Sequence, residues 1–155
     1  MSYKNKTYVI FDADTDIREY DLMKAWKEND NIDFNFYNAH NLNVISSSSS
    51  EEQIKRKLKK RLNNTKQAIV LVGKNTKNLY KFVRWEIEVA LEMDIPIIAV
   101  YLCESNETPP ILEKKAYFLS VSFKSLEVKK ALDMFPSEYD KNKSRAPYSI
   151  NLCDL

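Results

Sequence analysis

Short apolar runs alternate with amphipathic segments along the chain, and this alternation predicts the secondary structure. Four runs rich in apolar and β-branched residues predict strands that are covered on both faces, as in a parallel sheet. These runs are Tyr8–Phe11, Ala68–Val72, Ile95–Leu102 and Tyr117–Phe123. A fifth run, Phe34–Tyr37, alternates apolar and polar residues, which favours a strand nearer to the edge of the sheet.

The segments between these runs carry apolar residues at helical spacing. The expected helices span 16–29, 51–63, about 78–93, and a stretch that begins near Ser125. Asp16 and Glu19 stand at the spacing of a capping box, and so do Ser50 and Gln53. Both pairs therefore predict the first turn of a helix.

A chain in which strands and helices alternate forms a doubly wound sheet. The expected architecture is a flavodoxin-like, five-stranded parallel sheet with helices on both faces. Ligands of such folds bind outside the carboxyl ends of the strands. Residues 1–135 are expected to form this domain, and residues 136–155, which are polar and lose periodicity, a C-terminal tail that is packed on it or partly disordered.

Composition adds mainly exclusions. The chain has 155 residues, is 44% hydrophobic and carries a net charge of +2, so no charge excess argues for nucleic acid or a membrane as a partner. Residues 1–7 contain no apolar segment, and Cys103 and Cys153 match no metal or redox spacing. We therefore expect a reduced, cytoplasmic protein without a metal or a resident cofactor.

The chain contains a single glycine, Gly73, and a single histidine, His40. A Walker loop or a dinucleotide fingerprint needs several glycines so that backbone amides can approach phosphates. One histidine cannot build a multi-histidine metal site, and no nucleophile-elbow sequence accompanies His40. These classes of site are excluded.

The first polar cluster is Phe-Asp-Ala-Asp-Thr-Asp at residues 11–16, directly after the first strand. An EF-hand loop that began at Asp12 would need glycine and glutamate where Ile17 and Met23 stand, so calcium binding of that kind is excluded. The cluster also resembles the first motif of haloacid-dehalogenase phosphatases and the acidic pocket of response-regulator receivers. The alternative is that Asp16 caps a helix while Asp12 and Asp14 are solvated turn residues.

The phosphatase and receiver resemblances lack their remaining motifs. Asp16 stands where the phosphatases carry threonine or valine, and the sequence contains no later acidic motif of that family. A receiver needs a phosphorylatable aspartate at the end of its third strand, where this chain has Val72, Gly73 and Lys74. Phosphotransfer is therefore not expected.

The second candidate residue is Glu86, which lies on the inward face of its predicted helix. Its neighbours three and four positions away are apolar, whereas those of Glu88 include charged residues. The neighbours of Glu86 are Phe82, Val83, Val89 and Ala90. Desolvation should raise the pKa of such a carboxyl group, as is common in active sites. The alternative is a structural glutamate that accepts backbone hydrogen bonds or pairs with a basic residue.

A basic face on the helix at 51–63 is the third candidate. It consists of Lys55, Arg56, Lys57, Lys59, Lys60 and Arg61. These side chains could bind phosphates, but a charged row of this kind is more often the outer face of a helix that covers a sheet. No aromatic residue is interleaved with it, as single-stranded nucleic acid would require.

The stretch Phe82–Ile87, Phe-Val-Arg-Trp-Glu-Ile, resembles the glutamate motif of TIR domains. The resemblance extends over about residues 7–125 and includes Val70–Gly73 before the helix and Ile97–Val100 after it. The long connection at 38–50 looks like the loop that follows the second strand in TIR domains. The chain is most similar to a short bacterial TIR-like group related to the TIR proteins of Thoeris antiphage defence.

This resemblance implies an NAD-processing enzyme with Glu86 as its catalytic residue. The nicotinamide–ribose bond would be cleaved to give ADP-ribose or a cyclic ADP-ribose signal, with NAD as substrate. Self-association and a downstream effector that senses the nucleotide are also implied. The Phe-Asp-Ala-Asp-Thr-Asp opening departs from the Ser-Phe-rich opening of many such enzymes. The alternative is a non-catalytic TIR-like or receiver-like interaction module.

Further substrate-binding candidates lie near the carboxyl edge of the predicted sheet. Phe11 and Trp85 are expected either to stack against the ligand or to belong to the core. Asp12, Asp14 and His40 are additional candidates at the same edge. No residue is expected to bind a metal.

Overall fold

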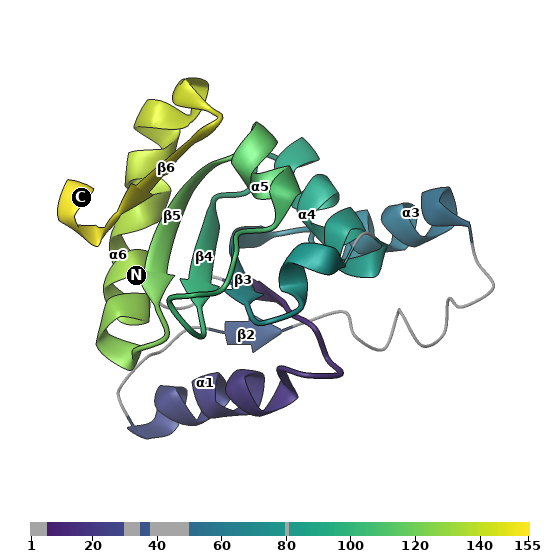
Figure 1. Ribbon diagram of the computed structural model, residues 1–155. Coiled ribbons are helices and arrows are strands. Elements are labelled where there is room, and N and C mark those ends of the chain that lie inside the picture. The colour runs from purple at the N-terminus through teal and green to yellow at the C-terminus, as the bar shows by residue number, and fades with distance from the viewer. Residues whose placement is uncertain (1–5, 30–34, 38–49, 80) are drawn as a thin grey trace.

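Six parallel strands form one sheet within residues 6–29, 35–37, 50–79 and 81–155, which the computed structural model describes. The order across the sheet is β2-β1-β3-β4-β5-β6 (Figure 1). The strands are β1 (Lys6–Ile10), β2 (Asn35–Tyr37), β3 (Thr65–Val72), β4 (Ile97–Tyr101), β5 (Tyr117–Ser122) and β6 (Tyr148–Asn151). The first five follow the flavodoxin-like order, which confirms the predicted fold class.

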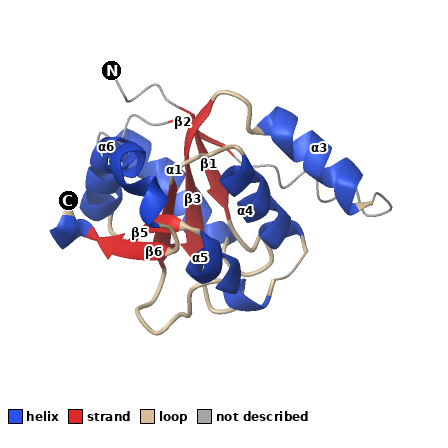
Figure 2. Ribbon diagram, turned by 90° about the horizontal axis from the view of Figure 1, so that it is seen from above, coloured by secondary structure: helices blue, strands red, loops and turns tan. Residues whose placement is uncertain are grey.

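Five α-helices in the described part of the chain cover this sheet on both faces (Figures 1 and 2). They are α1 (Ile17–Asn29), α3 (Glu51–Arg61), α4 (Phe82–Glu92), α5 (Pro110–Lys115) and α6 (Ser125–Asn142). Helices α3, α4 and α5 pack on one face, and α1 and α6 pack on the other. No helix among the described residues is long and apolar enough to cross a membrane.

The core consists of two layers because successive residues of a strand point to opposite faces of the sheet. In β1, Tyr8 and Ile10 face α3 and α4, whereas Val9 faces α1 and α6. In β3, Val70 belongs to the first layer and Leu71 to the second. All five side chains are fully buried, which explains why the central strands are almost entirely apolar.

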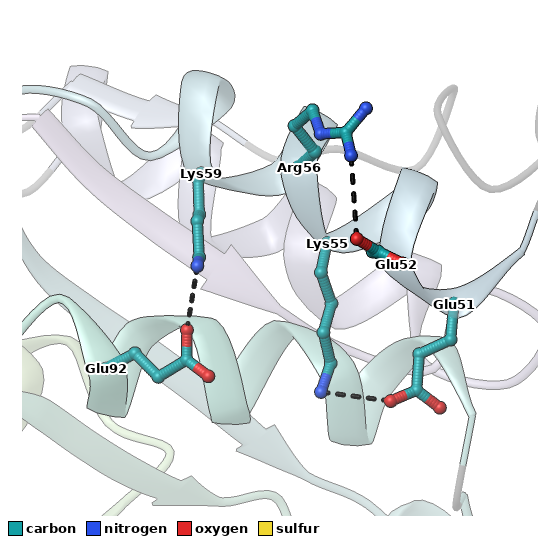
Figure 3. A pocket seen from close by; sticks show the side chains of 6 residues that line it. All are labelled: Glu51, Glu52, Lys55, Arg56, Lys59 and Glu92. Atoms are coloured by element: carbon teal, nitrogen blue, oxygen red, sulfur yellow. Dashed lines mark ion pairs between the residues drawn. The ribbon is translucent and has the colours of Figure 1, made fainter.

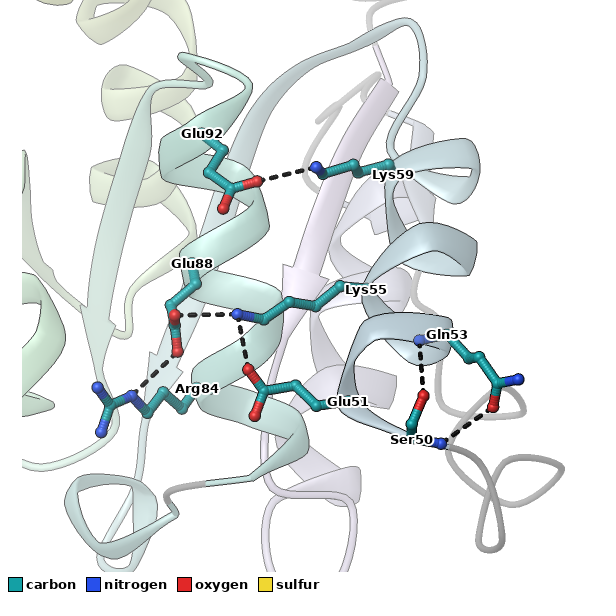
Figure 4. Close-up of polar contacts among 8 residues, drawn as sticks. All are labelled: Ser50, Glu51, Gln53, Lys55, Lys59, Arg84, Glu88 and Glu92. Atoms are coloured by element: carbon teal, nitrogen blue, oxygen red, sulfur yellow. Dashed lines mark hydrogen bonds and ion pairs between the residues drawn. The ribbon is translucent and has the colours of Figure 1, made fainter.

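Helix α3 begins as the sequence predicts. The backbone N–H of Gln53 donates to Ser50 Oγ at 3.2 Å, and the N–H of Ser50 donates to Gln53 Oε1 at 3.1 Å (Figure 4). This is a capping box, which satisfies two backbone donors at the helix start. Ile54 and Leu58 then face the sheet and are buried.

The C-terminal segment differs from the prediction. Helix α6 continues across Pro136 to Asn142, and β6 then pairs with β5, so regular structure extends beyond residue 135 and the sheet has six strands, not five. The sequence pattern missed β6 because it is short and lies at the edge. Of its four residues only Ile150 is buried, so the strand shows no apolar run.

If β6 is part of the folded core, Ile150→Ala should lower the free energy of unfolding by about 2–4 kcal/mol, because it removes buried apolar volume. Ile150 is 6% exposed and packs with the α1/α6 layer. Urea denaturation measures the change. Leu126→Ala is the control, since Leu126 is 77% exposed, and it should stay within about 0.5 kcal/mol of the wild type. Equal, small effects of both substitutions would show that β6 adds no stability.

Candidate functional site

The polar cluster after β1 forms a tight turn that Asp12 organises. The Asp12 carboxylate accepts hydrogen bonds from the backbone N–H of Asp14 at 3.1 Å and from the Thr15 hydroxyl at 2.8 Å. Its carbonyl oxygen accepts from the N–H of Asp16 at 2.7 Å. Asp12 is therefore a buried turn residue, so the alternative in which both carboxylates are solvated is wrong for Asp12 and holds for Asp14, which is exposed.

Asp16 is a buried carboxylate that lies against the only glycine of the chain. It is 6% exposed, and within the described residues its Oδ2 has no hydrogen-bond partner. A Cβ atom at Gly73 would lie 2.2 Å from Oδ2, so any side chain there would collide with the carboxylate. Burial, together with the charge of Asp12, raises the pKa of Asp16 to about 6.

The turn after Gly73 sets the start of α4. The N–H of Gly73 donates to Thr76 Oγ1 at 2.8 Å, and the Thr76 hydroxyl donates to the carbonyl oxygen of Leu71 at 3.2 Å. Thr76 is 1% exposed and opens a short 3₁₀ turn, Thr76–Asn78. This buried threonine closes the end of β3 and leads the chain into α4 from the carboxyl edge of the sheet.

Glu86 lies on the inward face of α4, as predicted. It is 4% exposed, and Tyr8 of β1 donates its hydroxyl hydrogen to Glu86 Oε2 at 2.5 Å. Burial raises the pKa of Glu86 to about 8, although the hydrogen bond from Tyr8 acts in the opposite direction. The carboxyl group is therefore mostly protonated at neutral pH. Its partner is a tyrosine, not a backbone group or a basic residue.

Sequence reasoning missed Tyr8 as a member of this site, although a signal was present. The alternation along β1 places every second side chain on the face that α4 covers. Tyr8 is the polar member of that set, and a buried phenol needs a hydrogen-bond partner. An inward glutamate and an inward tyrosine on adjoining elements could therefore have been paired in advance.

The two aromatic residues predicted to bind substrate lie on different faces of the sheet, and only Trp85 shares the face of Glu86. Phe11 is buried against Tyr20, with the rings stacked at 4.7 Å, on the face that α1 and α6 cover. Trp85 is half-buried on the opposite face, so these two aromatic rings lie on opposite sides of the sheet. His40 and most of the connection at 38–50 lie outside the described residues.

Charged residues line a groove of about 480 Å³ along α3 and the end of α4 (Figure 3). The groove is lined by Glu51, Glu52, Lys55, Arg56, Lys59 and Glu92. Each of its cations has an acidic partner: Lys55 and Glu51 are 3.1 Å apart, Lys59 and Glu92 3.1 Å, and Arg56 and Glu52 3.7 Å. This compensation supports the interpretation of α3 as a covering helix and argues against a phosphate site.

Glu88 shows how the outer face of α4 differs from its inner face. Its carboxylate accepts a hydrogen bond from Lys55 at 3.0 Å and another from Arg84 at 3.0 Å (Figure 4). Partial burial raises the pKa of Glu88, but these two cations outweigh burial and lower it. The pKa values of two glutamates only two residues apart are therefore shifted in opposite directions. In the described part of the chain, no cluster of three acidic, histidine or cysteine side chains could hold a metal ion.

The strand order, the helices on both faces and the inward glutamate of α4 together define a TIR-like domain on a flavodoxin-like sheet. Residues 3–107 match the family described as the TIR-like domain of the Thoeris protein ThsB, and the chain belongs to this family. The match extends from β1 through β4 and includes Glu86. It confirms the resemblance inferred from the sequence and supports a role in antiphage defence.

The contact between Gly73 and Asp16 can be tested by a double-mutant cycle. Gly73→Ala places a methyl group against the Asp16 carboxylate and should lower the free energy of unfolding by about 1–3 kcal/mol. In an Asp16→Ala background the same substitution should cost at least about 1 kcal/mol less, because the obstructing group is gone. Chemical denaturation of the four proteins measures the coupling. An equal cost in both backgrounds would rule out the contact.

The raised pKa of Glu86 predicts how stability depends on pH. The folded state binds this proton more tightly than the unfolded state, in which the pKa is near 4.5, so stability falls as pH rises toward 8. Glu86→Gln does not titrate. Its stability relative to the wild type should therefore increase by about 2–4 kcal/mol between about pH 5 and about pH 8.

Denaturant titrations at several pH values measure this difference, and Glu88→Gln is the matched control. Because the pKa of Glu88 is lowered, its ion pairs stabilise the fold above the unfolded pKa and are lost as pH falls. Between about pH 5 and about pH 8 the profile of Glu88→Gln should therefore run parallel to that of the wild type, and the two should differ progressively only as pH falls to about 4.5 and below. Glu86→Gln, in contrast, should gain stability relative to the wild type across the range from about pH 5 to about pH 8. Parallel pH profiles for the wild type and Glu86→Gln would contradict the assignment.

Proposed function

We propose that the protein is a TIR-type NAD-processing enzyme of antiphage defence, with Glu86 as its catalytic residue. It would cleave the nicotinamide–ribose bond and release ADP-ribose or a cyclic ADP-ribose product. The observation that supports this proposal best is the state of Glu86, a carboxyl group that is 4% exposed and has a pKa raised to about 8. Carboxyl groups perturbed in this way are concentrated in active sites.

The chemistry needs one carboxylate and no separate acid. Cleavage of the bond passes through a transition state with oxocarbenium character at the ribose carbon. A carboxylate beside the ribose stabilises that positive charge and can hold the ribose hydroxyls. Nicotinamide leaves as a neutral molecule from a cationic substrate, so its departure requires no protonation. Water then adds to the ribose carbon and loses a proton to give ADP-ribose, or the adenine of the same molecule adds there to give the cyclic product. The bond cleavage itself requires only the ionised form of Glu86.

The substrate itself favours the ionised form of Glu86. Nicotinamide in NAD carries a positive charge, and an opposite charge within a few ångströms lowers the pKa of a carboxyl group. Binding would thus release the proton that Glu86 holds in the free protein. The ionised fraction of Glu86 would therefore be larger in the complex with NAD than in the free protein.

The burial of Glu86 sets a condition on this proposal. A substrate reaches the carboxylate only if half-buried side chains near the start of α4 move, and Leu79, Phe82 and Trp85 are of this kind. Trp85 lies on the same face of the sheet as Glu86 and is the aromatic candidate best placed to contact nicotinamide. Phe11, Asp12, Asp14 and His40 remain candidates for contacts elsewhere on the substrate.

A non-catalytic interaction module is the second candidate function. The fact that Tyr8 satisfies Glu86 in the interior favours it, because buried carboxyl groups with a hydrogen-bond partner also serve structure alone. Such a module would act by self-association or by docking a partner protein. A downstream effector that senses the nucleotide product belongs to the enzymatic alternative.

The enzymatic proposal predicts that Glu86→Gln abolishes nicotinamide release, with a loss of at least about 100-fold in kcat, because an amide cannot stabilise the cationic transition state by charge. Incubation of the purified protein with NAD and chromatographic detection of nicotinamide measures this. Glu88→Gln is the control. It removes a glutamate two residues away on the outer face of α4, and it should retain activity within about threefold.

Two outcomes would overturn the proposal in different ways. Nicotinamide release that survives Glu86→Gln would leave an enzyme but remove its catalytic residue. A folded wild-type protein that releases no nicotinamide, even at high concentration where self-association is favoured, would support the interaction module.

A further inference from the structure

Tyr8 and Glu86 form a contact between two elements that are far apart in the sequence. Tyr8 lies in the middle of β1 and is fully buried, and its hydroxyl donates to Glu86 Oε2 on α4 at 2.5 Å. This contact occupies Oε2, one of the two carboxylate oxygens of Glu86. It also limits rotation of the carboxylate about its terminal bond, because a strong donor fixes the position of Oε2.

Neighbouring groups hold Tyr8 in place. Its ring meets the ring of Tyr37 edge to face, with centroids 5.1 Å apart. The Tyr37 hydroxyl is in turn hydrogen-bonded to the Thr65 hydroxyl, and it donates a hydrogen bond to the carbonyl oxygen of Arg61 at 3.0 Å. The position of Tyr8 is therefore restrained by Tyr37 of β2, which is itself anchored to the end of α3 and the start of β3. A donor held this rigidly pre-organises its acceptor at little entropic cost.

Few charged groups act on this pair from the surrounding elements. Tyr8 is the group that faces Glu86 from β1, and Tyr37 and Arg61 act on Tyr8 from β2 and the end of α3. Lys55 of α3 is engaged with Glu88 on the outer face of α4. The charged side chains of α5 are exposed; they are Glu113, Lys114 and Lys115. The Tyr8 hydroxyl is thus the one polar influence on Glu86 that the described residues provide at hydrogen-bond distance.

We propose that Tyr8 is the positioning residue for Glu86, and that its hydroxyl fixes Oε2 and sets the fraction of Glu86 that is ionised for the reaction. This inference rests on the proposed function of Glu86. It assigns Tyr8 no contact with substrate. Its effect passes entirely through the carboxylate that it holds.

The direction of the effect follows from the hydrogen bond. A donor stabilises a carboxylate more than a neutral carboxyl group, so the Tyr8 hydroxyl lowers the pKa of Glu86 against the larger effect of burial. Tyr8→Phe removes only that donor, and the pKa of Glu86 should rise by about one unit. At pH 7, below both pKa values, the ionised fraction of Glu86 in the free protein should then fall about tenfold. The value of kcat/KM, whose pH dependence reports the free protein, should fall by the same factor and recover at higher pH.

The test compares the titration of Glu86 with the pH dependence of nicotinamide release. Carbon-13 NMR of the glutamate carboxyl groups reports the titration, and Glu86→Gln identifies the signal. Tyr139→Phe is the matched control. It removes a tyrosine hydroxyl that donates to a carboxylate, that of Asp94, at 2.6 Å on the other face of the sheet. It should leave both the Glu86 titration and the release profile unchanged.

We expect Tyr8→Phe to raise both midpoints by the same amount, with KM for NAD within twofold of the wild type. A Glu86 midpoint that does not move, or a rate that falls equally at every pH, would overturn the role of Tyr8. If the Glu86 titration shifts but neither the wild type nor any variant releases nicotinamide, the proposed function is wrong. The positioning role of Tyr8 through Glu86 is then wrong as well. Should Tyr8→Phe prevent folding, Tyr37→Phe removes the hydrogen bonds that hold the ring packed against Tyr8, and it should raise both midpoints by a smaller amount; unchanged midpoints would overturn the role of Tyr8.

Discussion

A carboxyl group among aliphatic side chains must keep its proton or gain a partner, and Glu86 does both. Ionisation in this setting is opposed by desolvation, and the Tyr8 hydroxyl offsets only part of that opposition. The contact joins α4 to β1, the strand that lies between β2 and β3 at the point where the order of the sheet reverses. The same residue therefore links the packing of a covering helix to the chemistry proposed for it.

A second buried carboxyl group, that of Asp16, lies at the carboxyl edge of the sheet. The pKa of Asp16 is raised by its burial and by the charge of the neighbouring Asp12. Space for its carboxylate comes from the absence of a side chain at Gly73. The lack of any further glycine excludes phosphate-binding loops, but Gly73 itself has a steric role. Because it has no side chain, the loop after β1 can approach the end of β3.

The sequence alone was sufficient for the fold class, because continuous apolar runs and helical stripes specify which faces are buried. It was also sufficient for the inward orientation of Glu86, which follows from the spacing of its neighbours. It did not predict β6, because a strand with a single buried residue shows no apolar pattern. It also did not predict that Phe11 and Trp85 lie on opposite faces of the sheet, because this depends on which residues of each element point toward the sheet. Tyr8 was missed because predicting its contact with Glu86 requires knowing which residues of β1 and which residues of α4 face each other. Contacts between segments 78 residues apart are rarely visible in one sequence.

The family match ends at residue 107, before β5, α6 and β6. These later elements supply much of one core layer, including Leu119, Leu132 and Phe135, which pack with Val100 of β4. The matched region is therefore smaller than the packed core, because part of the α1/α6 layer lies beyond residue 107. A fragment that ended at residue 107 would leave the α1/α6 face of β4 without these apolar side chains, so the matched residues alone do not supply a complete core.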